Sequence, residues 1–181
     1  EKEELASVLF EEGKQLILQG QDFAFGVFDL VRRITPQNAA MHFKQGVFLF
    51  DYGVHKSGEK YLLQAQKQMS ESLRLDPKNL DAWVLHGDLL VHLGLINKQV
   101  NYFHQAHEKY VRADELSQED PKSSKKFMWD WALCSYYLGK HSGEAVDIKN
   151  AIERFEKAAK LGSIQENFWR DFGNAYVEMG L

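Results

Sequence analysis

Hydrophobic and small residues recur along this chain at the spacing of helical faces, and the arrangement returns every 41 to 45 residues. Within each unit, such residues follow one another at i, i+4 and i+7, which lines one side of a helix. The clearest examples are Ala65/Met69/Ser72, Ala106/Tyr110/Ala113 and Ala151/Phe155/Ala158. A period of this length predicts stacked units of two helices each.

Small residues also recur in the first helix of each unit. One lies near the middle of the helix, at Gly46, Gly87, Ala132 and Gly173. A glycine follows seven residues later, at Gly53, Gly94, Gly139 and Gly180. Because glycine readily adopts the left-handed conformation that ends helices, we expect the first helices to stop near these glycines. Proline can open a helix but not continue one, so Pro36, Pro77 and Pro121 mark the joins between units.

These signals predict an all-α chain with four helix pairs and one terminal helix. The expected helices are 3–19, 22–34, 37–52, 58–75, 79–93, 96–117, 122–138, 144–161 and 165–180. The expected units are about 1–36, 37–77, 78–121 and 122–162, followed by a first helix within 163–181. That last helix lacks a second helix and would expose the aromatic residues Phe168, Trp169, Phe172 and Tyr176. We therefore expect that the natural chain continues, that helix 165–180 caps the stack, or that it mediates self-association.

Composition narrows the possible class of protein further. With 181 residues, 44% hydrophobic and 27% charged, the chain fits one globular domain over 1–181. The net charge is −4 and no Lys/Arg stripe is present, so we expect no nucleic-acid partner. No apolar run approaches the ~20 residues of a membrane span, so we expect no membrane insertion. A single cysteine, Cys134, excludes a disulfide framework and favours a reducing, cytoplasmic compartment. Because the chain begins at Glu1 rather than Met, we interpret it as a fragment.

Two motifs point to a known family. The segment Trp169–Gly180 reads WRDFGNAYVEMG and fits W-x₂-L-G-x₂-Y followed by glycine, with Phe172 in place of leucine. The pattern Ala-x₃-aromatic-x₂-Ala occurs in Ala106–Ala113 and Ala151–Ala158. Together they resemble the tetratricopeptide repeat (TPR), whose usual period is about 34 residues. The resemblance implies a right-handed superhelical solenoid of antiparallel helix pairs, with a concave groove lined by the first helices, where partner peptides or helices bind.

The repeat here is longer than that of the family. Twelve residues separate Gly53 from Ala65, and the same spacing follows Gly94 and Gly139. We expect these extra residues to form a longer turn and an N-terminal extension of the second helix. The segments HKSGE at 55–59 and HSGE at 141–144 support this, since Ser or Gly before Glu is a helix-start signal.

Helical phase identifies the side chains expected to line the groove. They are Phe43, Val47, Phe50, Asp51, Val84, Asp88, Val91, His92, Asp130, Cys134, Tyr137, Arg170 and Asn174. The first unit offers Phe10, Lys14 and Ile17. For helix 122–138 the phase stays open by one position, because counting from Gly139 gives Trp129, Leu133 and Tyr136 instead.

The groove residues also indicate the kind of partner. A chaperone-binding subclass of the family holds a terminal carboxylate through Lys and Asn at these positions. Phe43 and Val47 stand there instead, and only Arg170 and Asn174 are of the right type, so we expect no such clamp. An apolar groove with acidic spots suits an apolar protein segment that carries basic residues. A translocator-class chaperone of type III secretion is the alternative, because Leu9–Pro36 loosely resembles its first unit.

Catalytic and metal chemistry have little support in the sequence. His104 and His107 stand at i, i+3, a spacing that can share a metal, but a surface pair is the better interpretation because nothing fixes further ligands. His86 is expected to be buried and hydrogen-bonded, and Cys134 to be packed and inert. No phosphate-binding glycine loop occurs. We therefore predict a binding scaffold without cofactor, metal or catalytic residues, with an enzyme as the remote alternative.

Overall fold

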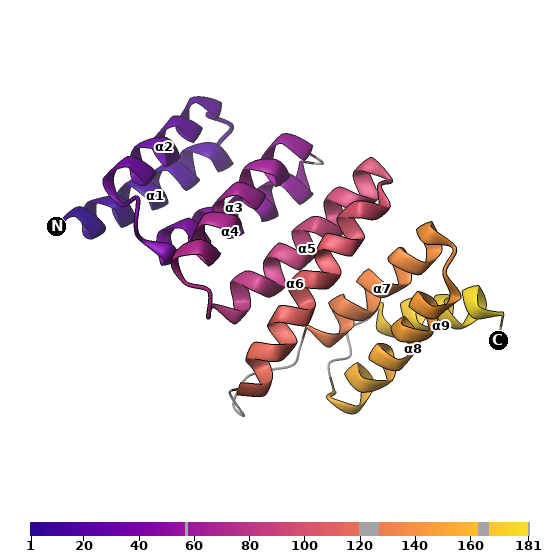
Figure 1. Ribbon diagram of the computed structural model, residues 1–181. Coiled ribbons are helices and arrows are strands. Elements are labelled where there is room, and N and C mark those ends of the chain that lie inside the picture. Colours follow the sequence, from indigo (N-terminus) through magenta and orange to yellow (C-terminus); the bar gives the residue numbers. More distant parts are fainter. Residues whose placement is uncertain (57, 120–126, 163–166, 181) are drawn as a thin grey trace. The chain divides into compact units, whose positions relative to one another are not determined.

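The computed structural model describes residues 1–56, 58–119, 127–162 and 167–180, of Asp22 the backbone only (Figure 1). The described residues form nine α-helices and one 3₁₀ turn, without a strand, which confirms the predicted all-α class. The chain divides into two compact units, Glu1–Ala82 and Trp83–Leu181. Whether the two units behave as the single domain expected from the sequence stays a prediction.

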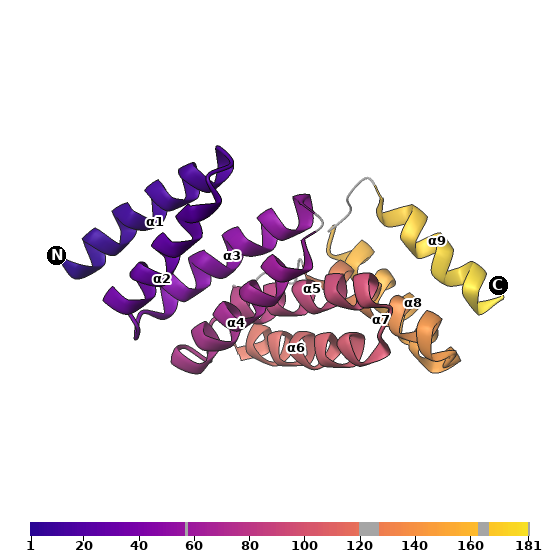
Figure 2. The same ribbon diagram turned by 90° about the horizontal axis from the view of Figure 1, so that it is seen from above.

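The first unit consists of two helix hairpins. They contain α1 (Lys2–Leu18), the turn η1 (Asp22–Ala24), α2 (Phe25–Ile34), α3 (Ala39–His55) and α4 (Glu59–Leu75). Consecutive helices pack side by side, α1 with α2 and α3 with α4 (Figure 2). Their interior is rich in aromatic rings, and Phe28 lies 5.3 Å from Phe10 and 5.4 Å from Phe48 between ring centroids.

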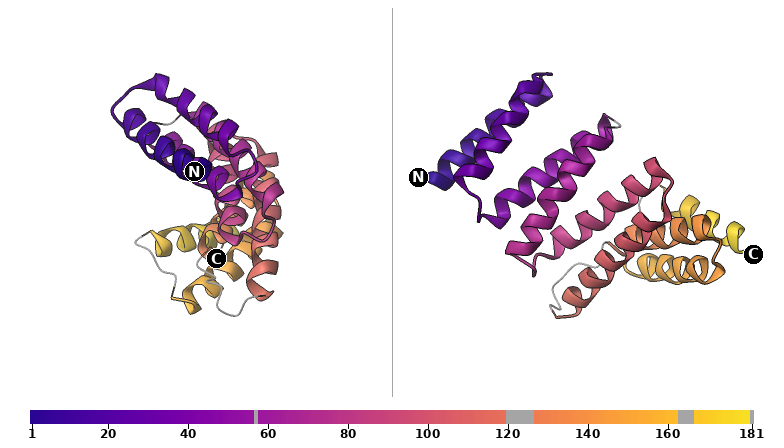
Figure 3. Two further views of the ribbon diagram at one scale, coloured as in Figure 1. Left: turned by 90° about the vertical axis from the view of Figure 1, so that its left-hand side faces the viewer. Right: turned by 45° about the horizontal axis from the view of Figure 1, so that its top comes forward.

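The second unit continues the same plan. It contains most of α5 (Leu80–Asn97), with α6 (Val100–Glu119), α7 (Met128–Ser142), α8 (Ala145–Lys160) and α9 (Phe168–Met179). In Figure 3, α5 lies beside α6, and α7 lies beside α8. None of the helices in the described ranges is long and apolar enough to cross a membrane.

The same interhelical contacts repeat from hairpin to hairpin. A Cβ atom added at Gly53 would lie 2.9 Å from Leu62 Cδ2, at Gly94 2.8 Å from Phe103 Cε1, and at Gly139 2.6 Å from Ile148 Cδ1. In each case the partner stands nine positions later in the chain. The central glycines contact the residue 23 positions later, Gly46 with Met69 and Gly87 with Tyr110. The repeat in the sequence is therefore a repeat of close contacts between antiparallel helices.

These contacts correct the role that we predicted for the terminal glycines. Gly53, Gly94 and Gly139 do not end their helices, which continue to His55, Asn97 and Ser142. Left-handed glycines are found instead at Gly20, Gly143, Gly162 and Gly180, so the prediction holds only for Gly180, which follows α9. The other three are glycine because the second helix approaches too closely for a side chain. This explains why the first helices predicted from the sequence ended three or four residues before those of the structure.

The predicted second-helix faces form the core. The residues Ala65, Met69, Ser72, Ala106, Tyr110, Ala113, Ala151, Phe155 and Ala158 are all buried. Ser72 Oγ donates a hydrogen bond to the Ala39 carbonyl at 3.0 Å, which satisfies the buried hydroxyl. The predicted pattern at i, i+4 and i+7 is thus confirmed.

Helix starts agree with the predicted joins where the structure describes them. Asn38 Oδ1 accepts a hydrogen bond from the Met41 amide at 2.9 Å, and Asn79 Oδ1 accepts one from the Ala82 amide at 3.0 Å. Both are side-chain caps of a first helix, one period apart. The predicted join at Pro121 and the predicted helix starts at 122 and 165 lie outside the described residues.

Helix α9 packs differently from the other first helices. Gly173, predicted as its central packing position, is exposed, and a Cβ added there would meet nothing within 4 Å. Ala175 and Phe168 are buried instead, and Phe168 packs against Phe155 with ring centroids 5.7 Å apart. Close packing at Gly173 needs a following second helix, and the described chain has none after α9.

Candidate functional site

Five predicted groove residues of the first unit lie together, three on α3 and two on α1. An open hollow of about 300 Å³ lies between α1 and α3. It is lined by Phe10, Glu11, Lys14, Phe43, Lys44, Val47, Phe48 and Asp51. Phe43, Val47 and Asp51 were predicted from helical phase, as were Phe10 and Lys14 for the first helix. Phe50, the fourth residue predicted on α3, is half-buried and does not line this hollow.

The hollow combines an apolar floor with a charged rim. Phe10 and Phe48 meet edge to face with ring centroids 6.5 Å apart. Lys14 Nζ lies 2.5 Å from Glu11 Oε2 and 5.7 Å from the centroid of the Phe10 ring. Asp51 is exposed at the rim, where partial burial raises the pKa of its carboxyl and the nearby His55 opposes that shift. Such a surface suits an apolar side chain flanked by a charged one.

In the second unit, two predicted acidic residues interact. Asp88 of α5 and Asp130 of α7 are both half-exposed. Burial raises the pKa of Asp88 to about 8, with the charge of Asp130 adding to the shift and the hydrogen bond from Tyr110 opposing it. Burial also raises the pKa of Asp130 to about 6. A cation placed beside this pair would favour its ionised form.

Three predicted groove residues are wrong, because their side chains are buried. Cys134 is fully buried and its thiol donates to the Phe103 carbonyl at 3.4 Å, so it packs against α6. Burial raises the pKa of that thiol far above its usual range, in keeping with the packed, inert role also expected of it. Val91 of α5 and Ile17 of α1 are buried as well. None of the three side chains is accessible to a partner.

Two helical phases were predicted for α7, and the burial of its side chains tests both. Trp129, Asp130, Leu133 and Tyr137 are half-exposed, whereas Tyr136 is buried. The exposed stripe therefore combines both predicted phases, and Leu133 belongs to it.

The remaining predicted residues lie at or near the surface. Val84 and His92 of α5 are half-exposed, and Arg170 and Asn174 of α9 are exposed. His92 Nδ1 lies 2.9 Å from the Asp88 carbonyl oxygen, which accepts a hydrogen bond from the ring. Tyr137 stacks on Phe103, and burial followed by the charge of Asp171 raises its pKa.

The predicted histidine roles hold only in part. His104 is exposed as expected, but His107 is half-buried and its Nδ1 accepts a hydrogen bond from Trp131 Nε1 at 3.2 Å. Burial, and then the charge of Arg154, lowers the pKa of His107. His86 is buried, but its Nδ1 has no hydrogen-bond partner in the described part of the chain. Burial lowers the pKa of His86 to about 4. Among the described residues, no three His, Cys, Asp or Glu side chains gather as a metal site.

Sequence reasoning missed a second cavity. It has a volume of about 460 Å³ and lies between α6, α7 and α8. Its lining residues are Asp114, Gln118, Met128, Trp131, Asn150, Glu153, Arg154, Lys157, Lys160 and Leu161. The signal that could have found it is the spacing of Arg154, Lys157 and Lys160, which places three cations along one side of α8.

The fold and these surfaces define a class. The chain is an all-helical protein of consecutive antiparallel helix pairs, an arrangement compatible with a helical repeat. Comparison with known protein-family models and with curated protein sequences found no match to this chain.

Proposed function

We propose that this chain is a TPR-like scaffold, a right-handed solenoid whose first helices bind a segment of a partner protein. The motif in Trp169–Gly180 and the period near 41 residues support the TPR-like assignment. The recurrence of interhelical contacts nine and 23 positions apart supports the stacking of equivalent hairpins. The cytoplasmic location expected from the sequence stays a prediction.

One observation carries the binding proposal. Residues chosen from helical phase alone, Phe43, Val47 and Asp51 of α3, line one open hollow together with Phe10 and Lys14 of α1. Phe10 and Phe48 belong to the core, but Phe43 and Val47 are half-exposed beside them, and exposed apolar surface is unfavourable in water. A partner that buries Phe43 and Val47 would relieve that exposure.

Acidic residues indicate the charge of the partner. Asp51 stands at the rim of the hollow in the first unit, and Asp88 and Asp130 interact on α5 and α7 of the second. Each unit therefore offers acidic side chains on the first helices. The pKa values of Asp88 and Asp130 are raised, and a cation of the partner beside them would favour their ionised form. The proposed ligand is an apolar segment of a protein that also carries lysine or arginine, with each unit supplying its own part of the binding surface.

Selection from a random peptide library displayed on phage tests this function. With the whole chain as bait, we expect enriched peptides to combine bulky apolar residues with Lys or Arg. Val47→Asp should then weaken binding of an enriched peptide by about tenfold or more, because it places a charge on the apolar floor. Leu63→Asp on α4 is the matched control, since Leu63 is 43% exposed and lies outside the hollow. Equal binding by the parent and Val47→Asp would refute the proposed surface.

A further inference from the structure

The cavity between α6, α7 and α8 presents a fixed guanidinium group. Arg154 of α8 stacks over the Trp131 ring, with 4.2 Å from its Cζ atom to the ring centroid. Its Nη1 donates to Ser135 Oγ at 2.9 Å, and the Ser135 hydroxyl in turn donates to the Trp131 carbonyl at 3.1 Å. Trp131 is itself held by its hydrogen bond to His107. Ser135 and Trp131, both neutral, thus position the Arg154 guanidinium. Burial lowers the pKa of Arg154, and the charges of nearby acidic groups, Glu153 and Asp114 among them, oppose that shift.

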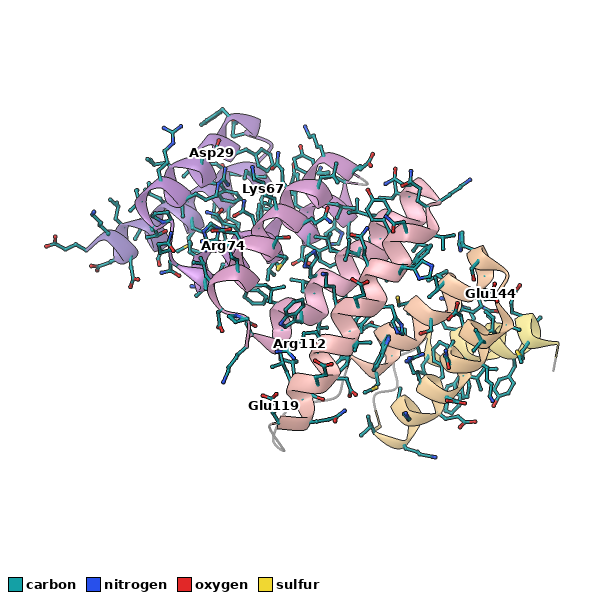
Figure 4. The ribbon with its side chains drawn as sticks, viewed as in Figure 1. Asp29, Lys67, Arg74, Arg112, Glu119 and Glu144 are labelled. Carbon is teal, nitrogen blue, oxygen red and sulfur yellow. The ribbon has the colours of Figure 1, made fainter. Side chains whose placement is uncertain are left out.

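Arg32, by comparison, has a carboxylate that balances its positive charge. Arg32 of α2 lines a hollow of about 300 Å³ between α2 and α4, with Asp29 and Lys67 among its neighbours. Arg32 forms an ion pair with Asp29, one turn earlier on the same helix. Figure 4 labels Asp29 and Lys67 on these adjacent helices. Arg154 has Asn150 and Ala151 one turn earlier, and within the described residues no carboxylate forms an ion pair with it.

Charge and composition of the cavity point to a ligand class. Among the described lining residues, Arg154, Lys157 and Lys160 outnumber Asp114 and Glu153 by one charge. Asp114 Oδ2 also accepts a hydrogen bond from Gln118 Nε2 at 2.7 Å within the same lining. The apolar part of the lining comes from Met128, Trp131 and Leu161. A volume of about 460 Å³ lies within the range of small-molecule sites.

We propose that this cavity binds a small monoanionic carboxylate with an apolar body, at a site separate from the partner-binding surface of the first helices. Arg154 has N–H donors beyond the one used by Ser135, and a planar guanidinium binds a carboxylate through two of them. The apolar body of the ligand contacts Met128 and Leu161. Stacking on Trp131 keeps the guanidinium plane fixed, which lowers the entropic cost of binding.

A matched ligand pair tests the proposal on the whole chain. The probes are 3-phenylpropionate and its neutral amide, followed by ligand-observed NMR and by the methyl signal of Met128. We expect the carboxylate to bind and to shift the Met128 signal, with the amide about tenfold weaker. Arg154→Gln should remove this preference for the carboxylate, whereas Arg32→Gln should retain it.

Two results would overturn the site. One is the absence of carboxylate binding by the parent protein at millimolar concentration, and the other is equal binding of acid and amide. If Arg154→Gln does not fold, Leu161→Glu replaces it, because Leu161 is 51% exposed at the cavity and glutamate there repels an anion. Carboxylate binding that survives Leu161→Glu as fully as it survives Leu63→Glu would also reject the proposal.

Discussion

Tyr110 of α6 donates a hydrogen bond to Asp88 Oδ1 of α5 at 2.5 Å, and the ring of the same tyrosine covers Gly87. The bond links a buried core ring to a half-exposed carboxyl on the predicted binding face. The packing of this hairpin and the chemistry of its surface are therefore coupled through one residue.

Overpacking at Gly87 should destabilise the fold. A Cβ atom there would lie 2.8 Å from Tyr110 Cζ, and the ring cannot move freely because its hydroxyl is bonded to Asp88. We expect Gly87→Leu to lower the free energy of unfolding by about 1–3 kcal/mol. Urea denaturation followed by circular dichroism measures the change.

Gly173→Leu provides the comparison for this prediction. Gly173 also lies within a helix, but an added Cβ there meets nothing within 4 Å. Because leucine has the higher helix propensity, we expect the free energy of unfolding to stay equal or to rise by up to about 1 kcal/mol. Equal losses in both variants would mean that the close contact between Gly87 and Tyr110 is not what makes the first position sensitive.

The acidic pair should make stability depend on pH. Burial raises the pKa of Asp88 from its ordinary value of 3.8 to about 8. Between these values the folded state binds more protons than the unfolded state, so the contribution of Asp88 to stability falls as pH rises from about 4 to 8. Asp88→Asn removes this titration and keeps an oxygen acceptor for Tyr110. We expect the variant to gain stability over the parent at pH 8 by about 1 kcal/mol or more, and less at pH 5.

The measurement is urea denaturation at a series of pH values. Glu108→Gln, at an exposed position of α6, controls for the loss of one negative charge. A difference between Asp88→Asn and the parent that stays constant from pH 4 to 8, or that has the opposite slope, would contradict the raised pKa.

The sequence predicted the helices well because the pattern that identifies each helix lies in residues close together in the chain. The faces through Met69, Tyr110 and Phe155 follow from the helical period, and the structure buries all three. The role of Gly139 was misassigned because a glycine needed for close approach and one needed for a left-handed turn look alike in sequence. Only the position of Ile148 across the hairpin distinguishes them.

The candidate sites were predictable to different degrees. The phase of a single helix placed Phe43 and Val47 on one face, and in the structure both line the same hollow. The cavity at Arg154 was missed because Trp131 and Met128 in its lining come from α7. The pattern of residues along α8 does not reveal how close α7 lies to it. Cys134 failed for a related reason, since helical phase does not tell which neighbouring helix covers a side chain.

Helix α9 is expected to mediate self-association. Trp169 is 59% exposed and Val177 is 76% exposed, on a helix that lacks a following partner in the described chain. We predict that the protein forms dimers at high concentration and that Trp169→Glu shifts the equilibrium to monomer, because the charge opposes burial of this face. Sedimentation velocity over a concentration series measures this, with Val146→Glu on α8 as the control of equal exposure, 59%. A parent protein that stays monomeric at the highest concentration would refute the prediction.

The most direct test of the proposed function is to map a bound peptide by NMR. The probe is a peptide selected by the whole chain that carries both apolar residues and arginine, titrated into ¹⁵N-labelled protein. We predict that the largest shift changes fall on the first helices, at Phe43, Val47 and Asp51 and beside Asp88. Changes confined to α2, α4, α6 and α8, with those first-helix signals unmoved at saturation, would contradict the account.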